Sequence, residues 1–270
     1  MALAPSDFAP GARVASEHME PGSGPIVSVF ERTFGPGTRL GGSRLLMVMS
    51  IVLLFRDSGT AALTFGEIQR TLQSPAGRSA LAKELAGDIR RDSGGGLRLK
   101  SLTVGAPVAL GLGQGSLKLP IVFRTSAGRI ELAFDILLLD RALGLVGVAA
   151  WPRAHLAPAD PQRAASALFR RFQAAFTVRN VVAPVIAGAA QAGQTLTADP
   201  GQWVGAPSTI AYQWSRCDAS GTTCTPVPGA VSQTYLVGTP DRGARLKVSV
   251  SASNTVSSSS LASNPTALVP

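Results

Sequence analysis

Hydrophobic and polar positions alternate along much of the first 150 residues, in short runs that glycine-rich segments separate. Alternation with a period of two is typical of strands that bury one face. One run, LLMVMSIVLLF at residues 45–55, is apolar except for Ser50. It is about half as long as the ~20 residues that a membrane-spanning helix needs. The run therefore predicts a buried strand, and the sequence predicts no transmembrane segment.

The period changes to helical spacing in two places. Leucine and isoleucine recur three to four positions apart between residues 60 and 89, which predicts one or two helices. Ser74 is expected as a cap and Pro75 at a first helical position. A second, amphipathic helix is expected from Asp160 to Phe176. The order strands, helix, strands, helix predicts an α+β domain over residues 1–178, an antiparallel sheet with helices on one side.

The amino-acid composition of the chain changes near residue 180. Glu disappears, and Ser, Thr, Gly, Ala and Pro dominate. Seven short strand candidates lie between residues 184 and 268, a density that is typical of a small β-sandwich. We therefore expect a linker at 179–183 and an all-β, immunoglobulin-like sandwich over 184–270.

Two cysteines, Cys217 and Cys224, bracket the polar segment DASGTT. A redox pair is usually Cys-x-x-Cys, and structural zinc needs about four ligands, whereas the chain adds only His18 and His155, both in the other domain. A turn between two strand ends would bring the two Cβ atoms within range of a hairpin disulfide. Such a bond indicates an oxidising compartment. The alternative is two reduced thiols in a cytosolic protein.

A set of glycines, aromatic residues and short motifs occurs along residues 184–269: Gly188, Gly193-Gln194-Thr195-Leu196, Trp203, Tyr212-Gln213-Trp214, Cys217 with Cys224, Gly229-Ala230, Tyr235 and Asp241-x-Gly243. In these features the segment resembles a bacterial immunoglobulin-like repeat found in extracellular proteins of actinobacteria and their relatives. The resemblance implies a sandwich with Trp214 in its core, supports the disulfide, and implies a secreted or surface location without catalysis. The expected core residues are Tyr212, Trp214, Tyr235, Leu246 and Val248.

The first domain contains the segments LAPSDFAPGARV, SVFERTF, RLLMVMSIVLLFRDSGTAALTF and GRIELAFDILLLDRALGLVGVAAW. In these segments it resembles the PsbP-like α+β domains of secreted lipoproteins. The resemblance implies a scaffold that binds a ligand or partner, and it transfers no site residues.

The formal net charge is +9, yet the basic residues are scattered and no basic run interleaves with aromatic residues. Nucleic-acid binding is therefore not expected. Residues 1–25 contain neither the basic nor the apolar region of a signal peptide. The expected location is nonetheless extracellular or at the cell surface, on account of the cysteines and the resemblance. The candidate partners are a cell-wall polymer, a carbohydrate or an extracellular protein.

Candidate catalytic groups do not combine into a known constellation. Gly-x-Ser-x-Gly is absent, and GLGQGS at 111–116 is interpreted as a hairpin turn because no helix follows it. Glu131 and Asp135 share one face of a predicted strand, which we expect to be solvated, with Arg129 and Arg141 near enough to neutralise them. We expect no catalytic residues, no metal and no cofactor.

The sequence thus predicts a non-catalytic binding or adhesion protein with an immunoglobulin-like spacer or attachment module. One alternative is a secreted enzyme acting on cell-wall or carbohydrate material, which would need Glu131 and Asp135 in a cleft. Another is a carrier of a small ligand, with a pocket between the sheet and the last helix of the first domain. That pocket would be lined by Leu168, Phe172 and Phe176.

Overall fold

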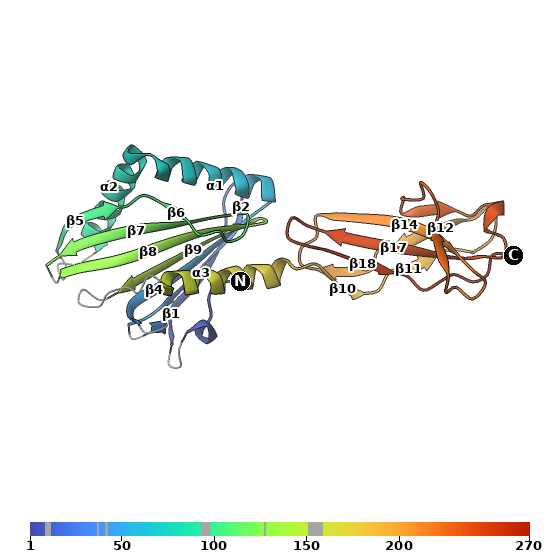
Figure 1. Cartoon of the computed structure of the whole chain (residues 1–270), viewed down its shortest axis with the longest axis horizontal. Coiled ribbons are helices and arrows are strands. Elements are labelled where there is room, and N and C mark those ends of the chain that lie inside the picture. Colours follow the sequence, from blue (N-terminus) through green and yellow to red (C-terminus); the bar gives the residue numbers. More distant parts are fainter. Residues whose placement is uncertain (9–11, 37, 41–42, 93–97, 127, 151–158) are drawn as a thin grey trace. The chain divides into compact units, whose positions relative to one another are not determined.

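The computed structural model describes the chain except for residues 9–11, 37, 41–42, 93–97, 127 and 151–158 (Figure 1). The chain divides into two compact units, Met1–Gln173 and Ala174–Pro270. The linker expected at residues 179–183 lies inside the second unit, where β10 (Arg179–Val182) pairs with β13 (Gln202–Val204).

A nine-stranded antiparallel sheet forms the centre of the first unit. Seven strands follow the order β1-β2-β4-β9-β8-β7-β5, while β3 pairs with β4 and β6 with β7. The apolar run at 45–55 forms most of β4, between β2 and β9, so the predicted buried strand is confirmed. The strands are β1 (Val14–Pro21), β2 (Ile26–Phe34), β3 (Arg39–Leu40), β4 (Ser43–Phe55), β5 (Leu99–Val104), β6 (Val108–Ala109), β7 (Gly115–Thr125), β8 (Gly128–Leu139) and β9 (Ala142–Ala150).

Three α-helices accompany this sheet in the part of the chain that the structure describes: α1 (Ser58–Gln73), α2 (Pro75–Asp92) and α3 (Ala159–Phe176). Only Ser74 separates α1 from α2. The Ser74 hydroxyl accepts the backbone N–H of Gly77 at 2.9 Å, which confirms Ser74 as a cap and Pro75 as a first helical residue. The chain turns so tightly here that a Cβ on Gly77 would lie 2.1 Å from the Thr71 carbonyl oxygen.

The helices lie on both faces of the sheet, not on one side as the sequence predicted. Gly144 and Leu145 are consecutive in β9, so they face opposite ways. A Cβ on Gly144 would meet Phe172 and Leu168 of α3, whereas Leu145 faces α1 and α2. Figure 1 shows α1 and α3 on opposite sides of the strands. Because helices lie over both faces of the central strands, apolar residues occur on both sides of these strands.

The N-terminal segment completes the α3 face of the sheet. Leu3 is fully buried, and its backbone N–H donates to the Ser50 hydroxyl of β4. Arg171 of α3 contacts Asp7, which lies in a 3₁₀ turn (Pro5–Asp7), with 2.7 Å between Nε and Oδ2. The segment is therefore held both to the sheet and to the helix that covers it.

The second unit, all of whose residues the structure describes, contains three antiparallel sheets instead of the two of the expected sandwich. Nine strands form these sheets where seven were expected. The structure is mostly β, with 45% of residues in strands and 23% in helices. The predicted fold class is therefore wrong both in its proportion of helix to strand and in its arrangement of layers. The sheets are β10-β13, β11-β12-β16 and β15-β14-β17-β18; the remaining bounds are β11 (Val185–Ala187), β12 (Thr195–Asp199), β14 (Thr209–Cys217), β15 (Cys224–Pro226), β16 (Thr234–Leu236), β17 (Arg245–Ser253) and β18 (Ser258–Ala262).

The core of the second unit surrounds Trp214. Trp214, Leu246 and Val248 are fully buried, while Tyr212 and Tyr235 are partly buried and pack against them. The Trp214 and Tyr235 rings stack with their centroids 5.4 Å apart. The Trp214 indole N–H donates to the Ser232 carbonyl, so this buried polar group has a partner.

Candidate functional site

A cavity of about 660 Å³ lies in the first unit, between the sheet and the corner that α1 and α2 form. Its floor is the sheet face opposite α3, where Phe123, Leu132, Phe134 and Leu145 point toward the two helices. Ile68 of α1 and residues of α2 supply its walls. The lining is almost entirely apolar.

Strand pairing places the floor residues next to one another. Ile121 of β7 lies opposite Leu132 of β8, and Leu119 lies opposite Phe134. Directly opposite residues of antiparallel strands share a face, and so do residues two apart on one strand. The alternation in these two strands therefore builds a continuous apolar surface under the helices.

This surface is only partly covered. Leu132, Phe134 and Leu145 are half-buried, although they are large apolar residues of central strands. Ala133 of β8 and Val146 of β9, which face α3 instead, are buried. A gap remains because the Ser74 corner turns α2 onto the edge strand β5, away from α1.

Polar groups of the cavity lining come from the two helices. Thr64, Glu67 and Thr71 belong to α1, and Glu84 belongs to α2. Both glutamates are exposed, so they lie at the open side of the cavity, above the apolar floor. Neither takes part in an ion pair or side-chain hydrogen bond with a residue that the structure describes. None of the described residues of the lining is a Lys, Arg or His.

Asp135, expected on a solvated face, is instead fully buried on the α3 side of the sheet, and that expectation is wrong. Neither carboxylate oxygen has a hydrogen-bond partner in the described part of the chain. Burial raises the pKa of Asp135 to about 6, against an opposing effect of Lys118. Glu131 shares this face and pairs with Arg129 at 3.0 Å. Neither carboxylate lines the cavity, so the two do not form the cleft that a glycosidase would need.

Two of the three pocket residues proposed from the sequence, Leu168 and Phe172, belong to the closed side of the sheet. Leu168, Phe172 and Phe176 of α3 are buried, and the first two fill the space above Gly144. None of the three lines the cavity under α1 and α2.

The residues that do line the cavity had a partial signal in the sequence. The helical run between residues 60 and 89 carries Ile68, Leu72, Leu81 and Leu85 at three-to-four spacing, and all four line the cavity. The spacing shows which helix face is apolar. It gives no indication that the sheet under that face stays partly open.

Histidine and metal chemistry add little to this site. His18 lies on β1, is exposed and contacts Glu20 at 2.6 Å, while His155 falls outside the described residues. Throughout the described ranges, no group of three or more His, Cys, Asp or Glu residues is arranged to hold a metal ion.

None of the described helices is long and apolar enough to cross a membrane.

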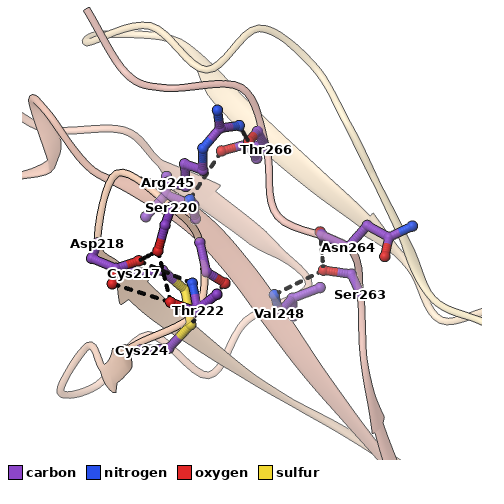
Figure 2. The surroundings of a disulfide bond; sticks show 12 residues. Cys217, Asp218, Ser220, Thr222, Cys224, Arg245, Val248, Ser263, Asn264 and Thr266 are labelled. Atoms are coloured by element: carbon purple, nitrogen blue, oxygen red, sulfur yellow. Dashed lines mark hydrogen bonds between the residues drawn. A yellow bond between two sulfur atoms is a disulfide. The ribbon is translucent and has the colours of Figure 1, made fainter.

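The disulfide predicted from the sequence is confirmed. Cys217 and Cys224 lie opposite each other in the β14–β15 pairing and are bonded (Figure 2). Hydrogen bonds from Ser220 and from the Thr222 backbone hold the pKa of Asp218 well below its usual range. Arg245 donates to the Ala219 carbonyl of this loop. These contacts are all internal, so they make the hairpin tip rigid without forming a ligand site.

Comparisons with known proteins assign no family. No family model matches the chain, and no curated protein matches it. One similar solved structure is the extracellular domain of PknH from Mycobacterium tuberculosis, with a TM-score of 0.34 and 8% sequence identity. The alignment covers 63% of this chain and 97% of that domain. At that TM-score the similarity identifies neither the fold nor the function.

Proposed function

We propose that this chain is an extracellular binding protein whose first unit takes up an apolar small molecule in the cavity under α1 and α2. The observation that carries the proposal is the cavity itself. Binding sites for small molecules usually measure 300–1,000 Å³ and are mostly apolar with a few polar groups, and this cavity meets both conditions. Its half-buried floor residues are the surface that a ligand would remove from water.

The asymmetry of the sheet supports this choice over a general adhesive surface. The α3 face is closed by a helix and by the N-terminal segment around Leu3. The α1–α2 face leaves aromatic and aliphatic side chains such as Phe134 partly uncovered. Burial of apolar surface contributes about 25 cal/mol per Å², so a ligand that covers this floor gains affinity without needing many polar contacts.

The disulfide supports the extracellular location, since such bonds persist mainly in oxidising compartments. The resemblance of residues 184–269 to repeats of extracellular proteins points the same way. We assign the second unit the role of a spacer or attachment module. Its most buried charged group, Asp241, is used in an internal ion pair with Arg216.

The cavity is tested with a neutral fluorescent probe, N-phenyl-1-naphthylamine, titrated onto the full chain. We expect saturable binding at one site. Ala80→Trp adds bulk at an exposed position that lines the cavity and should abolish binding, whereas Ala62→Trp, at an exposed α1 position outside the lining, should not. Circular dichroism checks that both variants fold. Absence of saturable binding to the folded chain, or equal binding by both variants, would refute the proposal.

The location is tested by mass spectrometry on the native protein from fractionated cells. A surface or medium fraction that carries the Cys217–Cys224 bond supports the proposal. A cytoplasmic protein with two free thiols contradicts it.

A further inference from the structure

We infer that the cavity selects cationic amphiphiles, molecules with an apolar chain and a single positively charged head group. This inference rests on the proposed function and adds the chemical class of the ligand. It follows from the placement of charge around the cavity.

The charged residues of the cavity lining have one sign. Among the described residues of the lining, only Glu67 and Glu84 are charged, and they belong to different helices. The protein as a whole carries a formal charge of +9, whereas the described lining of the cavity carries two carboxylates and no cation. The charge of the lining is therefore opposite in sign to the net charge of the protein. The cavity opening is therefore a local negative region on a basic protein.

Three arginines near the cavity donate to groups other than the two glutamates. Arg70 of α1 donates to the Gly66 carbonyl, and Arg78 donates to the carbonyl groups of Leu72 and Gln73 at the C-terminal end of α1. Arg91 pairs with Asp88 on its own helix. Lys83, which precedes Glu84 on α2, is exposed and lies outside the cavity lining. Neither glutamate forms an ion pair with a described residue, so both carboxylates can interact with a ligand.

The start of α2 does not offer an anion site that would offset the glutamates. Gly77 lines the cavity near that end, but its N–H already donates to the Ser74 hydroxyl. A helix N-terminus attracts anions through its free N–H groups, and this one is capped by its own chain. A carboxylate or phosphate head group would meet two like charges here.

The apolar residues lie at the floor of the cavity and the two glutamates at its rim, and this arrangement determines the orientation of the ligand. The apolar chain covers the floor around Phe134 and Leu145, while the head stays at the exposed rim beside Glu67 and Glu84. A cation at the rim keeps much of its hydration and gains two carboxylate partners. Charge attraction is stronger beside a low-dielectric surface than in bulk water, so the rim discriminates between head groups.

The experiment uses three probes with the same twelve-carbon chain: dodecyltrimethylammonium, dodecanol and dodecanoate. Each displaces N-phenyl-1-naphthylamine from the full chain at pH 7. The two ionic probes are kept below the concentrations at which they form micelles, and dodecanol is kept below its solubility limit. We expect the ammonium probe to bind at least about tenfold more tightly than dodecanol, and dodecanoate more weakly than dodecanol. The preference should shrink as salt is added, because the glutamates are exposed.

Variants separate the charge effect from the cavity. Glu67→Gln with Glu84→Gln should remove the preference for the ammonium probe and leave dodecanol binding unchanged. Asp88→Asn, which removes a carboxylate of α2 outside the lining, should keep the preference. Equal or tighter binding of dodecanoate, or a preference that survives the double variant, overturns the inference but leaves an apolar ligand site. Failure of all three probes to bind overturns the proposed function and this inference with it.

Discussion

Asp135 of β8 lies directly opposite Lys118 of β7, yet its carboxylate is sealed inside the protein. Burial disfavours the charged form and dominates over the attraction of Lys118, so the pKa of Asp135 is raised to about 6. A buried carboxylate without hydrogen bonds lowers the stability of the fold once it ionises.

The first prediction is that Asp135 makes stability fall between pH 4 and pH 7. The folded pKa is about 6 and the ordinary value is 3.8, so in this interval the folded chain holds more protons than the unfolded chain. Stability therefore decreases as pH rises through the window and levels off above it. The shift corresponds to about 3 kcal/mol.

Asp135→Asn tests this pH dependence, because it keeps the shape and removes the charge. Urea unfolding from pH 4 to pH 8 gives the free energy of unfolding of each protein. The value for the variant minus that for the wild type should increase by about 3 kcal/mol over this pH range. Glu131→Gln, on the same face but partly exposed and paired with Arg129, is the control and should show no such gain. A constant difference between Asp135→Asn and wild type at every pH would contradict the prediction.

The second prediction concerns the close approach of α3 to β9. A Cβ on Gly144 would lie 2.6 Å from Phe172 Cζ and 2.7 Å from Leu168 Cδ2. Gly144→Ala should therefore lower the free energy of unfolding by about 1–3 kcal/mol through overpacking. Gly87→Ala, in α2 with open space around it, should raise that free energy by about 0.5–1 kcal/mol. Denaturant unfolding of both variants measures the contrast; a neutral Gly144→Ala would show that α3 does not pack against β9 this closely.

The third prediction concerns Asp241, whose buried carboxylate accepts hydrogen bonds from three residues. Arg216 Nη2 lies 2.6 Å from Oδ1, and the Tyr235 hydroxyl and the Gly238 N–H donate to Oδ2 at 3.0 and 2.8 Å. Asp241→Ala leaves these donors without a partner and should cost about 3 kcal/mol. Tyr235→Phe removes one donor only and should cost about 1 kcal/mol. Thermal unfolding followed by tryptophan fluorescence compares the two, and similar costs would argue against a shared network.

The fourth prediction is that reducing the disulfide weakens the second unit by about 2 kcal/mol, because the bond closes a short loop. Dithiothreitol should lower the midpoint of unfolding of the second unit, Ala174–Pro270, followed by the fluorescence of its two tryptophans, Trp203 and Trp214, in a Trp151→Phe background. A Cys217→Ser, Cys224→Ser variant should start at the lower midpoint and not respond to the reductant. A response in the double variant would show that the reductant acts elsewhere.

Sequence periodicity located the elements of the first unit better than their layers. The largely apolar run at 45–55 predicted β4, and Ser74-Pro75 predicted the corner between α1 and α2. These features depend on neighbours along the chain. The alternation also showed that Glu131 and Asp135 share a face, but it does not show what covers that face. Only the position of α3 in space decides that Asp135 is buried.

The candidate site escaped prediction for the same reason. The apolar face of α3 indicated a pocket near Leu168 and Phe172, but Gly144 lets these side chains sit directly on β9. The cavity lies on the other face, where the turn after Ser74 carries α2 toward β5. A cavity is space that no side chain fills, and it depends on the angle between neighbouring elements. Sequence patterns therefore indicate a cavity only indirectly.

The strand order of the sheet has a consequence for how the first unit folds. β1, β2 and β4 form one run of neighbours and β9, β8, β7 and β5 another, and only the pairing of β4 with β9 joins them. β4 ends at Phe55, whereas β9 begins at Ala142. At roughly 5–20 residues per second, β4 waits on the order of ten seconds during synthesis for its partner. Through that interval the most apolar strand of the chain has an unpaired edge, so the nascent domain is most vulnerable to aggregation until β9 arrives.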